Sequence, residues 1–259
     1  MSSWRYPETA ESLVSFEKGS PGMKKLREYD VHDEFLTEYG NASIKNAQQI
    51  LDDAKILLSH KSFARAYFLA VAAIEEAGKA YMAFASRGRN LSDEGLKKKV
   101  QEMFENHSQK IGSAFAGWIA KSSNPRESVE AALDLMIHLK HGREKSMYVD
   151  ANPDNSLSIP MEIVRPAATI DSVKVAENCL HHTKTHISEN HPPSFSSFDD
   201  KLFCLRSEKI HEICNNDDFR GYLLSELKQT GRKFNFSKAI VTYHDKYFSR
   251  RKRFATKES

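Results

Sequence analysis

The sequence predicts an all-α protein, an up-down four-helix bundle with additional C-terminal helices. Between residues 41 and 149, apolar side chains recur with the three-to-four-residue period of amphipathic helices. The densest stretch, Ala66–Ile74, is apolar at all nine positions, which is typical of a helix enclosed by its neighbours. Strands with alternating apolar and polar residues are not recognisable. Successive helices joined by short breaks favour a bundle.

The first part of the chain divides into an arm and the bundle. Residues 1–40 show no sustained period, contain prolines and glycines as helix breakers, and predict an irregular N-terminal arm. The bundle domain is expected over residues 41–150. Its helices are predicted at about 43–59, 62–88, 92–120 (bent or interrupted near Gly112) and 127–147.

The second part of the chain predicts less compact structure. Residues 151–216 contain three prolines in their first 16 positions, which predict a long loop. Accessory helices are expected to follow at about 171–189 and 199–214. Residues 217–259 predict a basic helical extension and tail, with helices at about 219–230 and 237–248. This last region holds 11 Lys/Arg against 5 Asp/Glu, whereas the whole chain has a net charge of only +3. The asymmetry is a modest indication of an anionic partner.

Composition and motifs exclude several classes of protein. With 40% hydrophobic and 28% charged residues, the composition is globular rather than disordered. A nine-residue apolar run is far below the roughly 20 residues of a membrane span, and no signal-peptide pattern is present. Three cysteines form no disulfide framework, so a cytoplasmic location is expected. No dinucleotide, P-loop or nucleophile-elbow motif is present, and we expect no cofactor and no metal site.

Charged residues next to apolar helical positions mark a candidate site. Glu75 and Glu76 directly follow the apolar run, and Lys79 lies one turn beyond Glu75. Two adjacent glutamates on a helix point about 100° apart, so one of them is expected to lie close to the bundle interior. His107 and Lys110 share a helix face with apolar residues. These residues favour either an anion-binding site with a proton carrier or a structural salt-bridge network.

The fourth predicted helix adds two cations to this set. Lys140 and Arg143 continue an apolar stripe that includes Val129 and Leu133, at positions where another apolar residue is expected. Cations inside a bundle need acceptors. The paired glutamates and Asp150 are the candidates.

Three motifs, in order, resemble the AbiV-type abortive-infection proteins of the HEPN superfamily. They are an apolar helix ending in Glu-Glu-x-Gly-Lys, a downstream His-x-x-Lys, and an Arg shortly before Tyr-Val-Asp. The resemblance covers about residues 42–150 and extends more weakly to about residue 215. The matching positions are Glu75, Glu76, Gly78 and Lys79; His107 and Lys110; and Arg143, Tyr148, Val149 and Asp150.

This resemblance implies a helical bundle, commonly a homodimer with its polar site near the interface. It also implies an antiviral or toxin-type effector that acts on RNA, either tRNA or mRNA, through metal-independent cleavage or translation arrest. A phage-protein activator or an antitoxin is the implied protein partner. The site roles it suggests are proton transfer by His107, phosphate binding by Arg143 and Lys110, orientation by Glu75 or Glu76 with Lys79, and substrate contacts from Lys140, Tyr148 and Asp150.

This sequence departs from the superfamily pattern at one point, which leaves open whether the protein is an enzyme. The usual superfamily signature is an Arg followed four to six residues later by His, and Arg143 has no histidine at that spacing. The pair Arg206 and His211 has the spacing and is a second candidate. The alternative is a catalytically silent helical module that binds a partner protein or a nucleotide.

Overall fold

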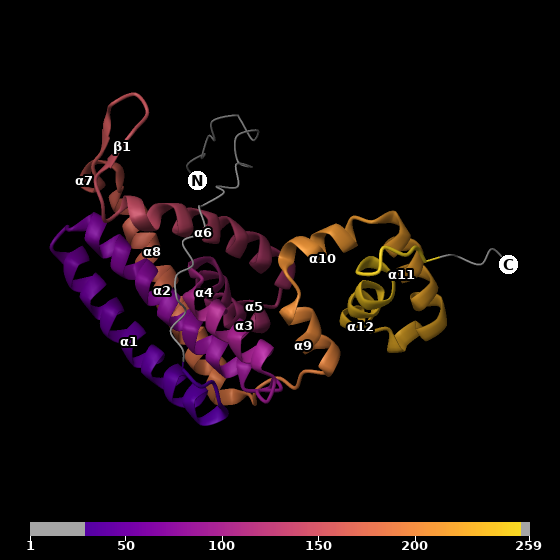
Figure 1. Ribbon diagram of the computed structural model, residues 1–259. Coiled ribbons are helices and arrows are strands. Elements are labelled where there is room, and N and C mark those ends of the chain that lie inside the picture. Colours follow the sequence, from indigo (N-terminus) through magenta and orange to yellow (C-terminus); the bar gives the residue numbers. More distant parts are fainter. Residues whose placement is uncertain (1–28, 255–259) are drawn as a thin grey trace.

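The structure is a computed structural model that describes residues 29–254, and this part of the chain is predominantly helical (Figure 1). The predicted all-α class is confirmed. The exception is a small antiparallel hairpin of two-residue strands, β1 (Asp150–Ala151) and β2 (Leu157–Ser158). Among the helices of residues 29–254, none is both long and apolar enough to cross a bilayer.

The bundle is organised around α2, which contacts helices on several sides. Its buried residues are largely alanines, and small side chains allow neighbouring helices to approach closely. The hairpin partner α1 and the later helix α8 cover one part of α2, while α4 and α6 cover another (Figure 1). These five helices are α1 (Asp33–Ser59), α2 (Phe63–Ser86), α4 (His107–Ala114), α6 (Pro125–Lys145) and α8 (Pro166–Glu189).

Helix α1 begins earlier than its sequence pattern predicts. The His32 side chain accepts a hydrogen bond from the backbone N–H of Phe35 at 3.2 Å and caps the helix. Asp33 and Glu34 in the first turn interact favourably with the positive end of the helix dipole. Residues 33–40, expected to be irregular, are therefore helical. Residues 29–32 of the predicted arm are not helical, and residues 1–28 lie outside the described residues.

The predicted helix 92–120 is three helices. They are α3 (Glu94–Glu105), α4, and α5 (Ala116–Lys121). The first break is at Asn106, whose side chain accepts a hydrogen bond from the Gln109 backbone N–H at 3.0 Å and starts α4. The break places His107 at the first position of a new helix.

Helix α8 belongs to the bundle. It starts at Pro166, a residue suited to the first helical turn because its missing N–H would have no partner there. Its buried side chains Val173, Ala176 and Leu180 join the main core, and the Thr169 hydroxyl donates to the Phe63 carbonyl oxygen at 3.2 Å. Residues 150–165, before α8, contain the hairpin and the short α7 (Pro160–Ile163).

Helix α6 presents a different face to the core than the sequence suggests. Ser128, Ala132 and Leu139 are buried, whereas Val129 and Leu133 are 40% and 52% exposed. The prediction that Val129, Leu133 and Lys140 form the inward stripe is wrong, because α6 carries apolar residues on two faces and a helical period alone does not select between them. Lys140 is exposed.

The C-terminal helices form a second unit with its own core, at one end of the bundle (Figure 1). The predicted helix 199–214 is interrupted at residues 205–206, where the backbone is extended. An aromatic cluster around Phe219, Tyr222 and Tyr243 fills the core of this unit. Its elements are α9 (Ser197–Cys204), α10 (Ser207–Cys214), α11 (Asp217–Thr230), a 3-10 turn (Gly231–Lys233), α12 (Phe236–Tyr243) and a π-helical turn (His244–Phe248).

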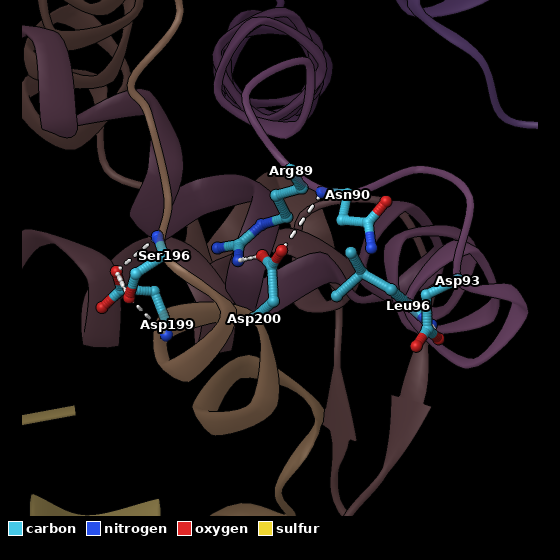
Figure 2. A network of polar contacts seen from close by, with 7 residues as sticks. All are labelled: Arg89, Asn90, Asp93, Leu96, Ser196, Asp199 and Asp200. Atoms are coloured by element: carbon cyan, nitrogen blue, oxygen red, sulfur yellow. Dashed lines mark hydrogen bonds and ion pairs between the residues drawn. The ribbon is translucent and has the colours of Figure 1, made fainter. Parts of the chain in front are cut away.

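Arg89 joins the two units. Figure 2 shows its guanidinium directed at Asp200, and Nη1 lies 2.9 Å from Oδ1 while the Asn90 backbone N–H donates to the other carboxylate oxygen at 3.1 Å. The Arg89 guanidinium carbon also lies 4.0 Å from the centre of the Phe195 ring and 3.8 Å from that of Phe203. Both members of the ion pair have side chains only 13% exposed.

Candidate functional site

The carboxylate of Glu75, on α2, is the centre of the candidate site. Its Oε2 lies 2.8 Å from His107 Nδ1 and 3.4 Å from Lys110 Nζ, both on α4. Its Oε1 lies 2.8 Å from Arg143 Nε on α6. One buried carboxylate, with a side chain 7% exposed, therefore gathers cationic groups from two other helices. This answers which of the paired glutamates faces the interior.

Two glycines bring these helices close enough for the contacts. Gly78 packs against the backbone of α4 at Lys110, one turn from Glu75. Gly142 packs against the Tyr67 side chain, where a β-carbon would lie 2.3 Å from the hydroxyl oxygen. The Tyr67 hydroxyl itself donates to the His138 carbonyl oxygen at 3.3 Å. The glycines thus set the spacing of α4 and α6 from α2.

His107 is the accessible member of the cluster. Its side chain is 51% exposed although its Nδ1 contacts the buried Glu75. A carboxylate beside Nδ1 favours the tautomer whose proton is on Nδ1, and the neutral ring then carries its lone pair on Nε2. This is the arrangement by which a carboxylate orients a histidine that acts as a general base.

Lys110 is buried and serves a different purpose. The residue is 5% exposed. Burial lowers the pKa of its ammonium, and nearby Lys79 lowers it further, while the charge of Glu75 opposes the shift. Because the ammonium is enclosed and directed at Glu75, Lys110 is placed to hold the carboxylate rather than to contact a substrate.

Arg143 lies at the edge of the cluster, with a side chain 23% exposed. Its contact with Glu75 is an ion pair without a hydrogen bond: within residues 29–254, neither Arg143 Nε nor Glu75 Oε1 has a hydrogen-bond partner. The guanidinium carbon lies 5.4 Å from the centre of the Phe68 ring. Its terminal nitrogens are not fixed by the Glu75 contact and are suited to a bidentate anion such as phosphate.

Glu76 and Lys79 form a separate pair on α2. The Lys79 ammonium lies 2.5 Å from Glu76 Oε1, and the side chains are 22% and 15% exposed. Around Glu75 one carboxylate faces a histidine, a lysine and an arginine, while Glu76 and Lys79 balance each other. The local excess of positive charge favours an anionic ligand.

The structure does not bring the other predicted residues to Glu75. Lys140 is exposed on α6, Tyr148 is 64% exposed, and Asp150 is exposed at the start of the hairpin. Arg206 and His211 lie on the C-terminal unit, where the His211 ring bonds to the Asn215 side chain at 2.9 Å rather than to Arg206.

Two neighbours of the site were not predicted. Phe68 lies beneath the Arg143 guanidinium, but inside an apolar run its position carries no distinguishing signal. Asn106 starts α4 just before His107, and an Asn followed by helix-forming residues is a recognisable capping signal.

Comparison with known families identifies the helical region that carries this site. The model of the HEPN_AbiV family, described as AbiV, matches residues 35–181. The matched region includes the first two thirds of α8 as well as the helices that carry Glu75, His107 and Arg143. Among curated proteins and among solved structures, nothing matches the chain. Because the family model covers more than half of the chain, the protein belongs to the AbiV family of HEPN abortive-infection proteins.

Proposed function

We propose that the protein is a metal-independent endoribonuclease that acts as an abortive-infection effector in the cytoplasm, with its active site at the Glu75 cluster. The observation that supports this most directly is the 2.8 Å contact between buried Glu75 Oε2 and His107 Nδ1, with His107 half-exposed. It joins a proton carrier that solvent can reach to a carboxylate that orients it.

The cluster supplies the base and the charge stabilisation for the reaction, and solvent supplies the acid. His107 Nε2 takes the proton from a ribose 2′-hydroxyl, and the 2′ oxygen attacks the adjacent phosphorus. Arg143 stabilises the added negative charge on the phosphorane oxygens. The bond to the 5′ oxygen then breaks, solvent protonates the leaving oxygen, and a 2′,3′-cyclic phosphate remains. Glu75 and Lys110 act as positioning residues.

The partners follow from the same proposal. RNA, either tRNA or mRNA, is the substrate, and cleaving it arrests translation in the infected cell. Such an activity is toxic to its host, so we also propose control by a phage-protein activator or by an antitoxin. The positive balance around Glu75 supports an anionic substrate.

The test is cleavage of purified tRNA and total RNA by the full chain in the presence of a chelator. Wild type is compared with His107→Ala and Arg143→Ala, each checked for native helicity by circular dichroism. His191→Ala, a change at an exposed histidine outside the cluster, is the matched control. We expect cleavage by wild type and the control, and its loss in the two site variants. Cleavage that persists in both folded variants contradicts the site and directs attention to Arg206 and His211.

One feature also supports the alternative of a catalytically silent binding module. Glu75 contacts groups from α4 and α6 simultaneously, which is how a structural network joins three helices. In that case wild type cleaves no RNA with or without metal. The site variants then change stability or partner binding alone.

A further inference from the structure

The C-terminal unit contains a pocket of about 730 Å³, outside the residues 35–181 that match the family model. It lies between the start of α11 and the segment that follows the π-helical turn. Pockets that hold small molecules or parts of larger ligands have volumes of roughly 300–1,000 Å³. Its lining includes the aromatic side chains Tyr243 and Phe248 and the cations Arg251, Lys252 and Arg253.

The three cations of this pocket have no counter-charge in the described structure. Arg251, Lys252 and Arg253 are exposed, and within residues 29–254 none of them forms an ion pair. The surrounding surface is positive as well, because residues 231–254 hold eight Lys/Arg and a single acidic residue, Asp245. Unpaired cations that line a concave surface favour an anionic ligand.

The two carboxylates that also line the pocket are engaged by other groups. Asp218 Oδ2 accepts hydrogen bonds from the Tyr243 hydroxyl at 2.8 Å and from the Phe254 backbone N–H at 2.7 Å. Asp217 Oδ1 pairs with Arg220 Nη1 at 2.7 Å on the same helix. Asp218 therefore fastens the end of the described chain to α11 and α12, which fixes the position of the three cations beside the pocket.

Arg251 has a left-handed backbone conformation, with φ of 52°. It follows the π-helical turn, where the Lys252 N–H donates to the Tyr247 carbonyl oxygen at 2.9 Å and the Arg251 N–H donates to that of Phe248 at 3.1 Å. In this type of helix end the left-handed position is usually a glycine. An arginine there is strained, and its exposed side chain gains no burial in return. A strained cation beside a pocket indicates a functional constraint, here the binding of an anion.

We infer that this pocket binds single-stranded RNA, with a base against the Phe248 ring and the adjoining phosphates on Arg251, Lys252 and Arg253. Cations beside an aromatic ring are the combination by which proteins bind single strands. The Phe248 ring is half-buried and stacks on the His244 ring, with centres 6.2 Å apart, so its orientation is fixed. Only an unpaired base can enter such a pocket, which disfavours duplex RNA.

Binding at this pocket deepens the proposed function, on which the choice of RNA as the ligand rests. It adds a second contact for the substrate of the Glu75 cluster, and the two sites share no residue. The probe is a labelled oligouridylate with 2′-O-methyl riboses, which lacks the hydroxyl that cleavage requires. Its binding is therefore measured whether or not the protein is a ribonuclease, and failure of either proposal leaves the other intact.

The first test is fluorescence anisotropy of this probe with the full chain at several salt concentrations. Lys252→Gln is expected to raise the dissociation constant about fivefold and to reduce the slope of log affinity against log salt by about 0.7, the loss of one phosphate contact. Lys233→Gln, the same change at an exposed lysine outside the pocket, is the matched control and is expected to behave as wild type. A wild type that does not bind the probe, or two variants with equal effects, overturns the inference.

Arg251→Gly separates a role in binding from a role in folding. Glycine adopts the left-handed conformation without strain, so no loss of stability in urea is expected. Binding of the probe is expected to weaken about fivefold, because one phosphate contact is lost. A variant that binds the probe as tightly as wild type contradicts the assignment of Arg251 to the pocket.

Phe248→Leu distinguishes RNA from any other polyanion. The loss of base stacking is expected to raise the dissociation constant of the probe about tenfold. Binding of heparin, which has charge but no bases, is expected to be unchanged, with native helicity confirmed by circular dichroism. If Phe248→Leu leaves binding of the probe unchanged, or if duplex RNA binds as tightly as the single strand, the pocket is a general polyanion surface and the inference is wrong.

Discussion

Gly78 of α2 packs directly against Lys110 of α4, where a β-carbon would lie 1.8 Å from the Lys110 carbonyl oxygen and 2.7 Å from its carbonyl carbon. The neighbour is backbone rather than a flexible side chain, so any larger residue must push the two helices apart. The same approach places the Lys110 and His107 side chains against Glu75, one turn earlier on α2. The glycine of the Glu-Glu-x-Gly-Lys motif is therefore a packing requirement of the site.

Gly78→Ala is expected to lower the free energy of unfolding by about 3 kcal/mol, through overpacking at the α2–α4 contact. Gly221→Ala is the control, because a β-carbon at Gly221 on α11 meets no atom within 4 Å. There the gain in helix propensity is expected to stabilise the protein by about 0.5–1 kcal/mol. Urea unfolding followed by circular dichroism measures both. Equal stability of Gly78→Ala and wild type would show that the helices separate without cost.

The two adjacent glutamates are expected to respond very differently to neutralisation. Glu75→Gln removes the charge of a carboxylate whose side chain is 7% exposed and which contacts Lys110, Arg143 and the His107 ring. The loss is expected to be about 3–5 kcal/mol, because buried cations are left without a counter-charge. Glu76→Gln breaks one pair nearer the surface and is expected to cost less than about 1 kcal/mol. Urea unfolding measures both losses. Equal unfolding free energies of the two variants would contradict the assignment of Glu75 as the centre of the site.

High pH is expected to destabilise the protein through its buried tyrosines. Burial, followed by the nearby charges of Glu76 and Glu105, raises the pKa of Tyr39 to about 12. In the unfolded chain a tyrosine loses its proton near pH 10. Stability from this residue is therefore complete below about pH 10 and is lost between pH 10 and 12. Burial likewise raises the pKa of Tyr29 and of Tyr222 to about 12, which adds to the effect.

The measurement is the free energy of unfolding in urea at pH 8, 10 and 11. Tyr39→Phe is expected to show a smaller decrease above pH 10 than wild type, because one group no longer gains a proton on folding. Tyr148→Phe, at a side chain 64% exposed, is the control and is expected to follow wild type. A Tyr39→Phe profile that parallels wild type would contradict the contribution of Tyr39.

The sequence was sufficient to predict the helical class and the residues that meet at Glu75, because charges beside apolar helical positions require partners. It did not distinguish Glu75 from Glu76, since both follow a helix that is apolar all round. It also placed Lys140 inside. Leu133 and Ile137 are as apolar as the buried residues of α6, and only the positions of the neighbouring helices decide which face is covered.

Local signals also explain the errors in helix boundaries. The apolar period continues through Asn106 and predicts one helix, whereas α3 ends there and the Asn106 side chain caps the start of α4. The sequence pattern places Pro166 in a loop, although proline at the first turn is compatible with the helix that follows. Asn106 and Pro166 are each compatible with the start of a helix and with a break in one. Tertiary contacts determine which of the two forms.

The attachment of the C-terminal unit is expected to depend strongly on Arg89. Its guanidinium lies between two aromatic rings and pairs with Asp200 where both side chains are 13% exposed, so Arg89→Leu leaves a carboxylate with little solvent and removes both ring contacts. We expect a loss of about 3 kcal/mol in unfolding free energy and faster proteolysis within residues 190–196. Arg89→Lys keeps the charge but not the planar group that stacks on the rings, and is expected to recover only part of the loss.

Arg220→Leu provides the comparison, because Arg220 is 61% exposed and pairs only with Asp217 of its own helix. Its effect is expected to be below about 0.5 kcal/mol. If Arg89→Leu changed stability and proteolysis no more than this control, the ring and ion-pair contacts would not be what attaches the unit, and the apolar contacts between α3 and α9 would have to hold it alone.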